Sequence, residues 1–354
     1  MRSFVFKVHV RVVSSAYVIA MPKTLFGFVV IGQLLCAECQ SSPWLLRNAI
    51  PTGRLDVGAA IAWDLADPFV VAVGGNSRVS PGTYSSRMER YLCTADTWTT
   101  VRSMPTARQR AGAHYSSGGV VYVIGGDIGP SSTYQNERYA VSTQTWTSGT
   151  AMPSGARDRP GYGQLGDVFM CVGGNAPLSQ PSVAFDVMTD SWTSKKAIPT
   201  GRLGLAVATD GSAQLYAIAG IVNPNVASTS KVEKYNMATD AWATVASTPW
   251  TYLGMTAVHH GANIYTIGGA TYMGSSSNLV SMYAVATDVW SQSAQVGPLN
   301  LARLGGVAVA GLNALFLIGG ENDPVDKLAV TAVPTAAPTT TRYGWAEWFG
   351  VRVP

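Results

Sequence analysis

The chain has 354 residues, of which 47% are hydrophobic and 12% charged, so it can bury a large core, and its 37 glycines favour an all-β fold over a helical one. Its net charge of +4 comes from Arg2, Lys7, Arg11 and Lys23, because the residues beyond position 37 hold 20 basic and 20 acidic side chains. This even balance argues against a nucleic-acid-binding surface.

Residues 1–37 read as a targeting leader. Met21-Pro22-Lys23 precedes an apolar run from Leu25 to Leu35, which is the arrangement of a signal peptide and is too short for a stable membrane span. The basic, acid-free stretch before Met21 leaves other readings open: a start at Met21, a transit peptide, or an uncleaved anchor. The sequence therefore predicts a secreted protein or one of the secretory pathway, the alternative being an organelle or membrane anchorage through the leader.

From residue 70 onward, an apolar segment runs repeatedly into a double glycine. Intervals of 51, 48, 46, 49 and 51 residues separate the second glycines, and one pair has alanine in its first position. The pairs are Gly74-Gly75, Gly125-Gly126, Gly173-Gly174, Ala219-Gly220, Gly268-Gly269 and Gly319-Gly320. A period of this size indicates an array of supersecondary units that bury their apolar faces against one another.

A second pattern fills the gap between successive double glycines. In five copies an aromatic residue precedes a tryptophan by seven positions, with a turn signal between them, and in four of these a proline follows the tryptophan after seven more. The aromatic pairs are Tyr91/Trp98, Tyr139/Trp146, Phe185/Trp192, Tyr235/Trp242 and Tyr283/Trp290. Each unit therefore has four short strands, which is the blade of a β-propeller.

These motifs resemble Kelch repeats, as in Ser103-Met104-Pro105-Thr106-Ala107-Arg108 after the Tyr91/Trp98 pair. The resemblance covers residues 38–333 and implies an all-β, six-bladed Kelch-type β-propeller of four-stranded antiparallel blades. It says less about function, because Kelch propellers include adaptor modules, oxidases and sugar mutarotases.

The N-terminal segment is expected to close the last blade. No aromatic/tryptophan hairpin follows Gly319-Gly320, whereas Trp44, Pro51 and Arg54 repeat the spacing of Trp98, Pro105 and Arg108. The segment before Pro51 would thus supply the outermost strand of the final blade and leave no unpaired edge there. The alternative is an open array with an incomplete last blade.

Residues 334–354 are expected to form a Pro/Thr-rich linker and an aromatic tail of unassigned role. The cysteines show no disulfide framework, and free thiols are the favoured interpretation.

Few residues outside the repeat carry chemistry. His259 and His260 are adjacent, so in a strand they point to opposite faces and do not make a metal site. The resemblance to galactose-oxidase-like Kelch enzymes would require two histidines and two tyrosines around copper, a set that this sequence does not assemble. We therefore predict no catalytic residue, no metal ligand and no cofactor.

One constellation remains as a candidate ligand-binding site. A basic residue follows the proline of most blades, tyrosine replaces it in blade five, and blades two and three carry a second arginine two residues on. Rotational repetition would gather these side chains around one mouth of the central channel, bordered by loops that hold Tyr84, Tyr134 and Tyr272. The candidate residues are Arg54, Arg108, Arg110, Arg157, Arg159, Arg202, Tyr252 and Arg303.

Two functions follow from this reading. The favoured one is a non-catalytic, monomeric protein- or glycan-binding module whose arginine-lined mouth takes an anionic peptide or glycan. The alternative is a carbohydrate-directed enzyme, mutarotase-like or oxidase-like, which would need a carboxylate beside the arginines, and Asp158 is the candidate. A third interpretation concerns the arginines themselves: the first arginine of each blade would be structural and bond neighbouring backbone.

Overall fold

A computed structural model describes the chain over residues 11–13, 16–18, 44–64, 67–77, 83–129, 131–153, 157–174, 180–223, 227–271, 275–292, 297–299, 301–311, 314–320 and 329–334. The chain divides into two units, Met1–Gln40 and Ser41–Pro354. In the first, β1 (Arg11–Val13) and β2 (Ala16–Val18) form an antiparallel hairpin. Most of the expected leader and the tail beyond residue 334 lie outside the described residues.

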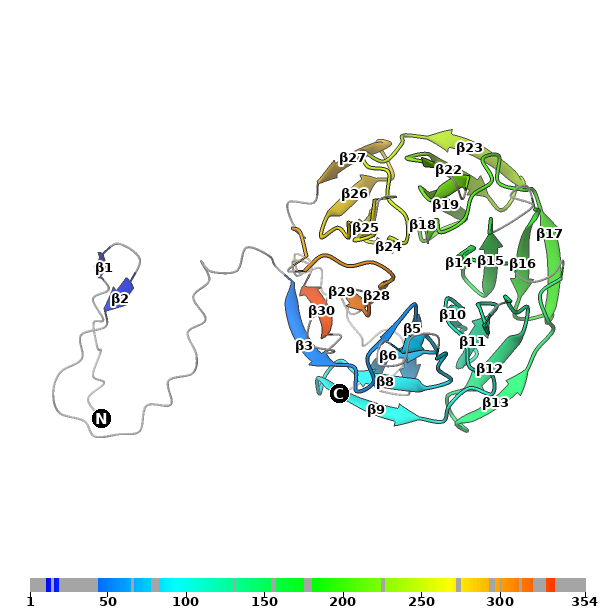
Figure 1. Cartoon of the computed structure of the whole chain (residues 1–354), viewed down its shortest axis with the longest axis horizontal. Coiled ribbons are helices and arrows are strands. Elements are labelled where there is room, and N and C mark those ends of the chain that lie inside the picture. Colours follow the sequence, from blue (N-terminus) through cyan, green and yellow to red (C-terminus); the bar gives the residue numbers. More distant parts are fainter. Residues whose placement is uncertain are drawn as a thin grey trace, which may run out of the picture. The chain divides into compact units, whose positions relative to one another are not determined.

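The second unit consists of four-stranded antiparallel sheets arranged in a ring (Figure 1). Five of the sheets are blades built from strands that follow one another along the chain, and in each the innermost strand comes first. They are blade one, β5 (Gly58–Asp64), β6 (Asp67–Val73), β8 (Met88–Leu92) and β9 (Thr97–Val101); blade two, β10 (Gly112–Tyr115), β11 (Val120–Ile124), β12 (Asn136–Ala140) and β13 (Thr145–Ser148); blade three, β14 (Gly161–Leu165), β15 (Val168–Val172), β16 (Ser182–Asp186) and β17 (Ser191–Lys195); blade four, β18 (Ala206–Thr209), β19 (Gln214–Ile218), β22 (Val232–Asn236) and β23 (Ala241–Val245); and blade five, β24 (Thr256–His260), β25 (Asn263–Ile267), β26 (Val280–Ala284) and β27 (Val289–Gln292). The prediction of an all-β propeller with four-stranded antiparallel blades is confirmed.

Another four-stranded sheet joins distant parts of the sequence. It contains β28 (Val307–Gly311), β29 (Ala314–Ile318) and β30 (Ala329–Pro334), and its outermost strand is β3 (Leu45–Ala49). The register pairs Leu45 with Ala332 and Ala49 with Ala329. Two short ribbons complete the strands of this unit: β4 (Arg54–Leu55) with β7 (Asn76–Ser77), and β20 (Ile221–Asn223) with β21 (Ala227–Ser228).

The double glycines are required where each second strand ends. Gly74 and Gly75 have φ angles of 69° and 99°, in the left-handed region that glycine tolerates best. A Cβ atom on Gly74 would lie 2.5 Å from the carbonyl oxygen of Arg108, which belongs to the connection into the next blade. The repeat therefore keeps glycine here because the backbones of adjacent blades nearly touch.

The aromatic pairs and turn aspartates fasten neighbouring blades together at the outer rim. Tyr235 donates its hydroxyl to Asp240 at 2.7 Å, and Asp240 also accepts from the backbone N–H of Lys196 in the preceding blade at 3.0 Å. The indole of Trp242 donates to the carbonyl of the same Lys196 at 3.0 Å. β3 is held likewise, because Asn48 donates its N–H to Asp96 and accepts from the indole of Trp98.

The hydrophobic core lies between adjacent blades. The second strands are almost completely buried, as in β6, where Val70, Val71 and Val73 are 0% exposed. Within the described residues, no helix is both long and apolar enough to cross a bilayer.

Removal of residues 38–50 tests the role of β3. A chain that starts at Pro51 loses the partner of β30 and the bonds of Asn48 to blade one, so we expect a large drop in melting temperature or aggregation through the exposed edge. Thermal unfolding followed by circular dichroism measures it. A chain that starts at Ser41 is the matched control, and equal melting of the two chains would show that β3 is dispensable.

Candidate functional site

Five of the eight candidate site residues do not line a mouth at all. Arg54, Arg108, Arg157 and Arg202 are 0% exposed, and Arg303 is 4% exposed. The expectation that they offer guanidinium groups to a ligand is wrong, because each side chain turns into the protein and bonds buried carbonyl oxygens. The structural interpretation of the first arginine in each blade describes them correctly.

Arg108 shows how these arginines work. Its backbone carbonyl accepts from the N–H of Gly75 in blade one at 2.8 Å. Its side chain enters blade two, where Nη1 donates to the carbonyl of Gly125 at 3.2 Å and Nη2 pairs with Glu137 at 2.6 Å. One residue thus joins two blades, and we call this arrangement the arginine clasp.

The clasp recurs with equivalent glutamates in two other blades. Arg54 and Arg202 pair with Glu89 and Glu233, the counterparts of Glu137. Burial lowers the pKa of Arg54, Arg108 and Arg202, and the adjacent glutamates act in the opposite direction.

Two other clasps have a different second partner. In blade three Val183 stands in the place of the glutamate, and Arg157 donates instead to the carbonyls of Gly173 and Pro181 at 3.2 and 2.6 Å. Arg303 donates to the carbonyl of Gly319 at 3.3 Å.

Blade five departs from the clasp. Tyr252 stands in the arginine position, is partly buried, and stacks on Trp250 with ring centroids 6.4 Å apart. A cavity of about 10 Å³ lies beside it, lined by Gly268, Leu279 and Ser281 among others. Counterparts of these three residues hold the guanidinium group in the other blades, so the cavity corresponds to the unfilled end of an arginine socket.

The residue two positions after each clasp lies at the channel mouth in a left-handed conformation. Its φ angles run from 47° to 71° at Asp56, Arg110, Arg159, Gly204, Gly254 and Gly305. Backbone hydrogen bonds link these positions from blade to blade. The N–H of Arg110 donates to the carbonyl of Asp56, that of Asp56 to Gly305, that of Gly305 to Gly254, that of Gly254 to Gly204, and that of Gly204 to Arg159. These five bonds join the six positions in one row from Arg159 through Gly305 to Arg110, and we call the six positions the mouth ring.

Charged side chains at the mouth form one cluster over blades one to three: Asp56, Arg110 and Arg159 of the mouth ring, with Asp127 and Asp158 beside them. Arg110 contacts a carboxylate of each blade: its Nε lies 3.0 Å from Asp56, and its Nη1 lies 3.2 Å from Asp127 and 3.9 Å from Asp158. The Nε of Arg159 lies 3.2 Å from both carboxylate oxygens of Asp158. Within this mouth cluster, the side chains of Arg110 and Arg159 are 34% and 42% exposed.

The mouth cluster is not the unpaired positive patch that the sequence predicts. It holds three carboxylates and two guanidinium groups. Burial tends to lower the pKa of Arg110, but the charges of Asp56, Asp127 and Asp158 raise it above its ordinary value. Sequence reasoning missed Asp56 and Asp127. Asp56 was detectable, because it stands two residues after Arg54 as Arg110 stands after Arg108.

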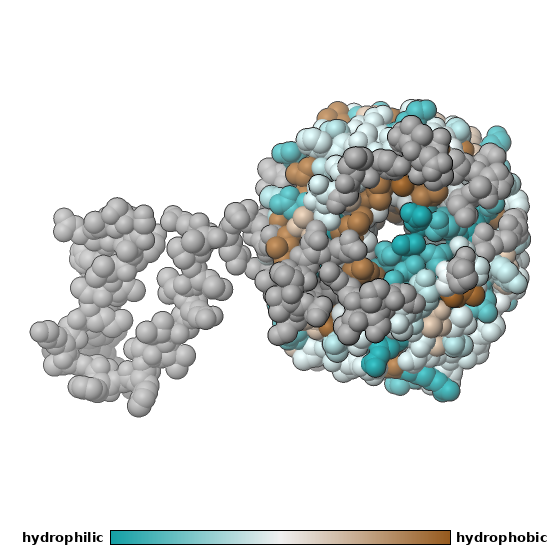
Figure 2. Space-filling model, in the orientation of Figure 1, coloured by the Kyte–Doolittle hydropathy of each residue, from teal (hydrophilic) through white to brown (hydrophobic). Residues whose placement is uncertain are grey.

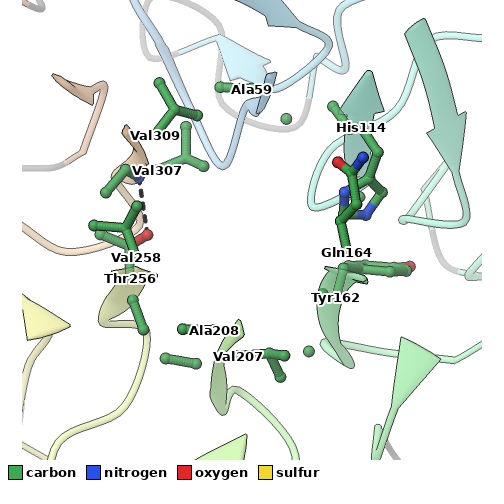
Figure 3. A pocket seen from close by; sticks show the side chains of 18 of the residues that line it. Ala59, His114, Tyr162, Gln164, Val207, Ala208, Thr256, Val258, Val307 and Val309 are labelled. Atoms are coloured by element: carbon green, nitrogen blue, oxygen red, sulfur yellow. Dashed lines mark hydrogen bonds between the residues drawn. The ribbon is translucent and has the colours of Figure 1, made fainter. Parts of the chain in front are cut away.

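Below the mouth, a channel of about 590 Å³ runs between the innermost strands β5, β10, β14, β18, β24 and β28. Figure 3 shows His114, Tyr162 and Gln164 on one wall and valines from β24 and β28 on the wall facing them. His259 also lines the channel, and burial lowers its pKa. Among the described residues, no three His, Cys, Asp or Glu side chains are grouped as metal ligands. Cys93 and Cys171 are free thiols, as expected.

Substitution of the clasp arginines tests their structural role. Arg108→Met strands a buried Glu137, so we expect a loss of about 3–5 kcal/mol in the free energy of unfolding. Arg157→Met should cost less, because Val183 stands in the place of the carboxylate there, and Arg108→Met/Glu137→Met should recover part of the loss. Urea denaturation measures all three, and equal losses for Arg108→Met and Arg157→Met would contradict the role of the buried charge.

The pH dependence of stability tests the environment of His114. Burial lowers the pKa of His114 to about 4, below its value in the unfolded chain, so unfolding takes up a proton between those two values and the stability falls as the pH drops from about 6.5 to 4. His114→Phe should remove up to about 3 kcal/mol of this acid destabilisation. Denaturation curves at pH values spanning that window provide the measurement. Parallel pH profiles of the two proteins would show that His114 titrates normally.

Comparisons with known proteins agree with the geometry. A family model described as the Kelch motif matches residues 116–153, which cover most of blade two. The Kelch-like protein terF of Aspergillus terreus is 29% identical over 188 residues, which are 49% of this chain and 39% of that protein. The chain thus matches about two fifths of the length of this relative.

A solved structure, titled "Structure of YjhT", superposes with a TM-score of 0.64 at 18% identity, over 80% of this chain and 94% of the other. At this level of identity the likeness concerns the fold. Together with the repeated double glycines, aromatic pairs and clasps, these matches support a Kelch-repeat β-propeller.

Proposed function

We propose that the chain is a non-catalytic binding module that holds its ligand at the channel mouth, over blades one to three. The observation that carries the proposal is the contrast within the mouth ring. Blades four and five and the sheet of β28 have glycine there, whereas blades one to three have Asp56, Arg110 and Arg159 in the same left-handed conformation. A side chain in that conformation costs about 1 kcal/mol, and such strain concentrates at functional sites.

The charges of the mouth cluster restrict the ligand. Three carboxylates beside two guanidinium groups would repel a polyanion, but Arg159 has only Asp158 as its described ion-pair partner and is the more exposed of the two arginines. Its contacts with Asp158 are made by Nε, so the terminal amino groups are available for a bidentate bond. We therefore infer a peptide or glycan with a single carboxylate group, flanked by hydroxyl or amide groups that the aspartates can accept from.

Exposed apolar side chains at the same end of the propeller favour a peptide. Ile128 and Tyr134 lie in the loop after Gly125-Gly126, and Trp250 and Leu301 lie in connections between blades. In an antiparallel blade these two kinds of loop meet at one end, which is also the end of the mouth ring. Figure 2 shows hydrophilic surface gathered on one side of the opening with hydrophobic surface opposite. A peptide could contact both the hydrophilic and the hydrophobic surface.

A carbohydrate-directed enzyme remains the second candidate, on one observation. Asp56, Asp127 and Asp158 place three carboxylates beside the arginines where the sequence suggested one. Burial raises the pKa of Asp127, although Ser132 and Arg110 lower it, and a raised carboxyl pKa suits a general acid. Turnover of an aldose or glycoside that Asp127→Asn abolishes would favour this candidate over the binding module.

We also infer that the sheet of β28, β29, β30 and β3 is the sixth blade, closed by the N-terminal strand. The pairing of β3 with β30 and the bonds of Asn48 to blade one support this. Secretion through the leader and a monomeric state stay predictions.

The binding proposal is tested by Arg159→Gly. Because glycine occupies the same place in three other positions of the ring, this change relieves strain, and we expect stability to rise by about 1 kcal/mol while ligand binding falls at least about tenfold. A peptide and glycan array screened with the wild-type protein identifies the probe, and calorimetry compares the variants.

Gln144→Gly is the matched control. Gln144 has a φ angle of 56° in an exposed outer turn of blade two, away from the mouth, so the change should stabilise the protein and leave binding intact. Binding by Arg159→Gly at wild-type strength would overturn the proposal.

A further inference from the structure

The channel has two chemically different walls. β10 and β14 contribute His114, Tyr162 and Gln164, whereas the facing strands contribute mainly valines and alanines such as Val258 and Val307, with Thr256 and His259 among them (Figure 3). Among the described lining residues, the charged side chains are Asp56, Arg110 and Arg159, all at the mouth. The interior therefore has a polar wall and a mainly apolar wall.

His114 carries an unused hydrogen-bonding atom on the polar wall. It is 9% exposed, and its ring stacks on Phe169 with centroids 4.5 Å apart and planes at 20°. Within the described part of the chain, its Nε2 is buried and has no hydrogen-bond partner. A buried polar atom without a partner costs about 1–3 kcal/mol, so a ligand that draws the ring of His114 toward the channel and supplies the partner gains a specific interaction.

The protonation state of His114 decides which partner suits it. Because burial holds its pKa at about 4, the imidazole is neutral at physiological pH. A neutral imidazole donates from one nitrogen and accepts at the other. The neighbouring Gln164 already donates its amide to the carbonyl oxygens of Tyr115 and Gly166 at 2.7 and 2.8 Å.

We propose that the channel binds a neutral, flat ring compound with a hydroxyl group on one edge, a phenol or related hydroxylated ring. The hydroxyl bonds the imidazole of His114, and the opposite edge of the ring packs on Val258, Val307 and Val309. About 590 Å³ falls within the range of small-molecule pockets. This site lies deeper than the mouth cluster, has no ionic contact and does not rest on the proposed function.

The test compares two probes that differ in one hydrogen-bond donor, naphthol and methoxynaphthalene, in fluorescence titrations. We expect the wild-type protein to bind naphthol about five- to tenfold more tightly, which is the difference made by one neutral hydrogen bond. His114→Phe keeps an aromatic ring against Phe169 and should bring the two affinities within about twofold of each other. His260→Phe is the matched control, because His260 is not among the residues that line the channel.

A second measurement needs no substitution at His114. In histidine-selective nitrogen NMR of the wild-type protein, naphthol should shift an imidazole nitrogen signal of His114 and methoxynaphthalene should not. Equal affinities for the two probes, unchanged discrimination in His114→Phe, a naphthol-independent His114 signal, or no saturable binding would each overturn the proposal. Arg159→Gly should leave naphthol binding unchanged, which separates this site from the one at the mouth.

Discussion

The arginine clasp is the interaction on which the propeller depends. A blade has apolar faces on both sides and gains stability only by packing against its neighbours, so the connection between blades must fix their separation and angle. By itself, Arg108 joins two blades. Its backbone carbonyl accepts a hydrogen bond from Gly75 of blade one, and its side chain donates to Gly125 of blade two. Because the guanidinium group is buried against Glu137, the separation and angle of the two blades have little freedom to vary. The double glycines, which allow the close approach, and the mouth ring, which begins two residues later, both follow from that contact.

The periodic features of the chain predicted an all-β propeller of four-stranded antiparallel blades, which the structure confirms. Double glycines, aromatic pairs and prolines recur because each occupies one site in every blade, and a site that repeats must be structural in most copies. The same logic favoured the structural interpretation of Arg54, Arg108 and Arg202, whose partners Glu89, Glu137 and Glu233 also recur at one place. Both sets were visible in the sequence. Their pairing was not, because the arginine and glutamate of a clasp are about 30 residues apart and meet only through the sheet.

The residues of the two proposed sites depart from the repeat. Arg110 and Arg159 stood out because blades two and three carry a second arginine two residues after the first, and the structure places them side by side in the mouth cluster. Their charge environment was beyond sequence reasoning, since Asp127 comes from a loop whose position depends on the register of blade two. His114 also lies outside the repeat pattern, and its stacking on Phe169 depends on the angle between two blades.

Tyr252 has a consequence for the mechanics of the ring. Where the other blades have a buried guanidinium group, the boundary between blades four and five has a tyrosine and a small cavity, with a backbone bond of 3.3 Å between Gly220 and Tyr252. Local unfolding starts where the stabilising contacts are fewest. Amide hydrogen exchange should therefore be fastest at this boundary, and new chain termini introduced there by circular permutation should be tolerated better than at any clasped boundary.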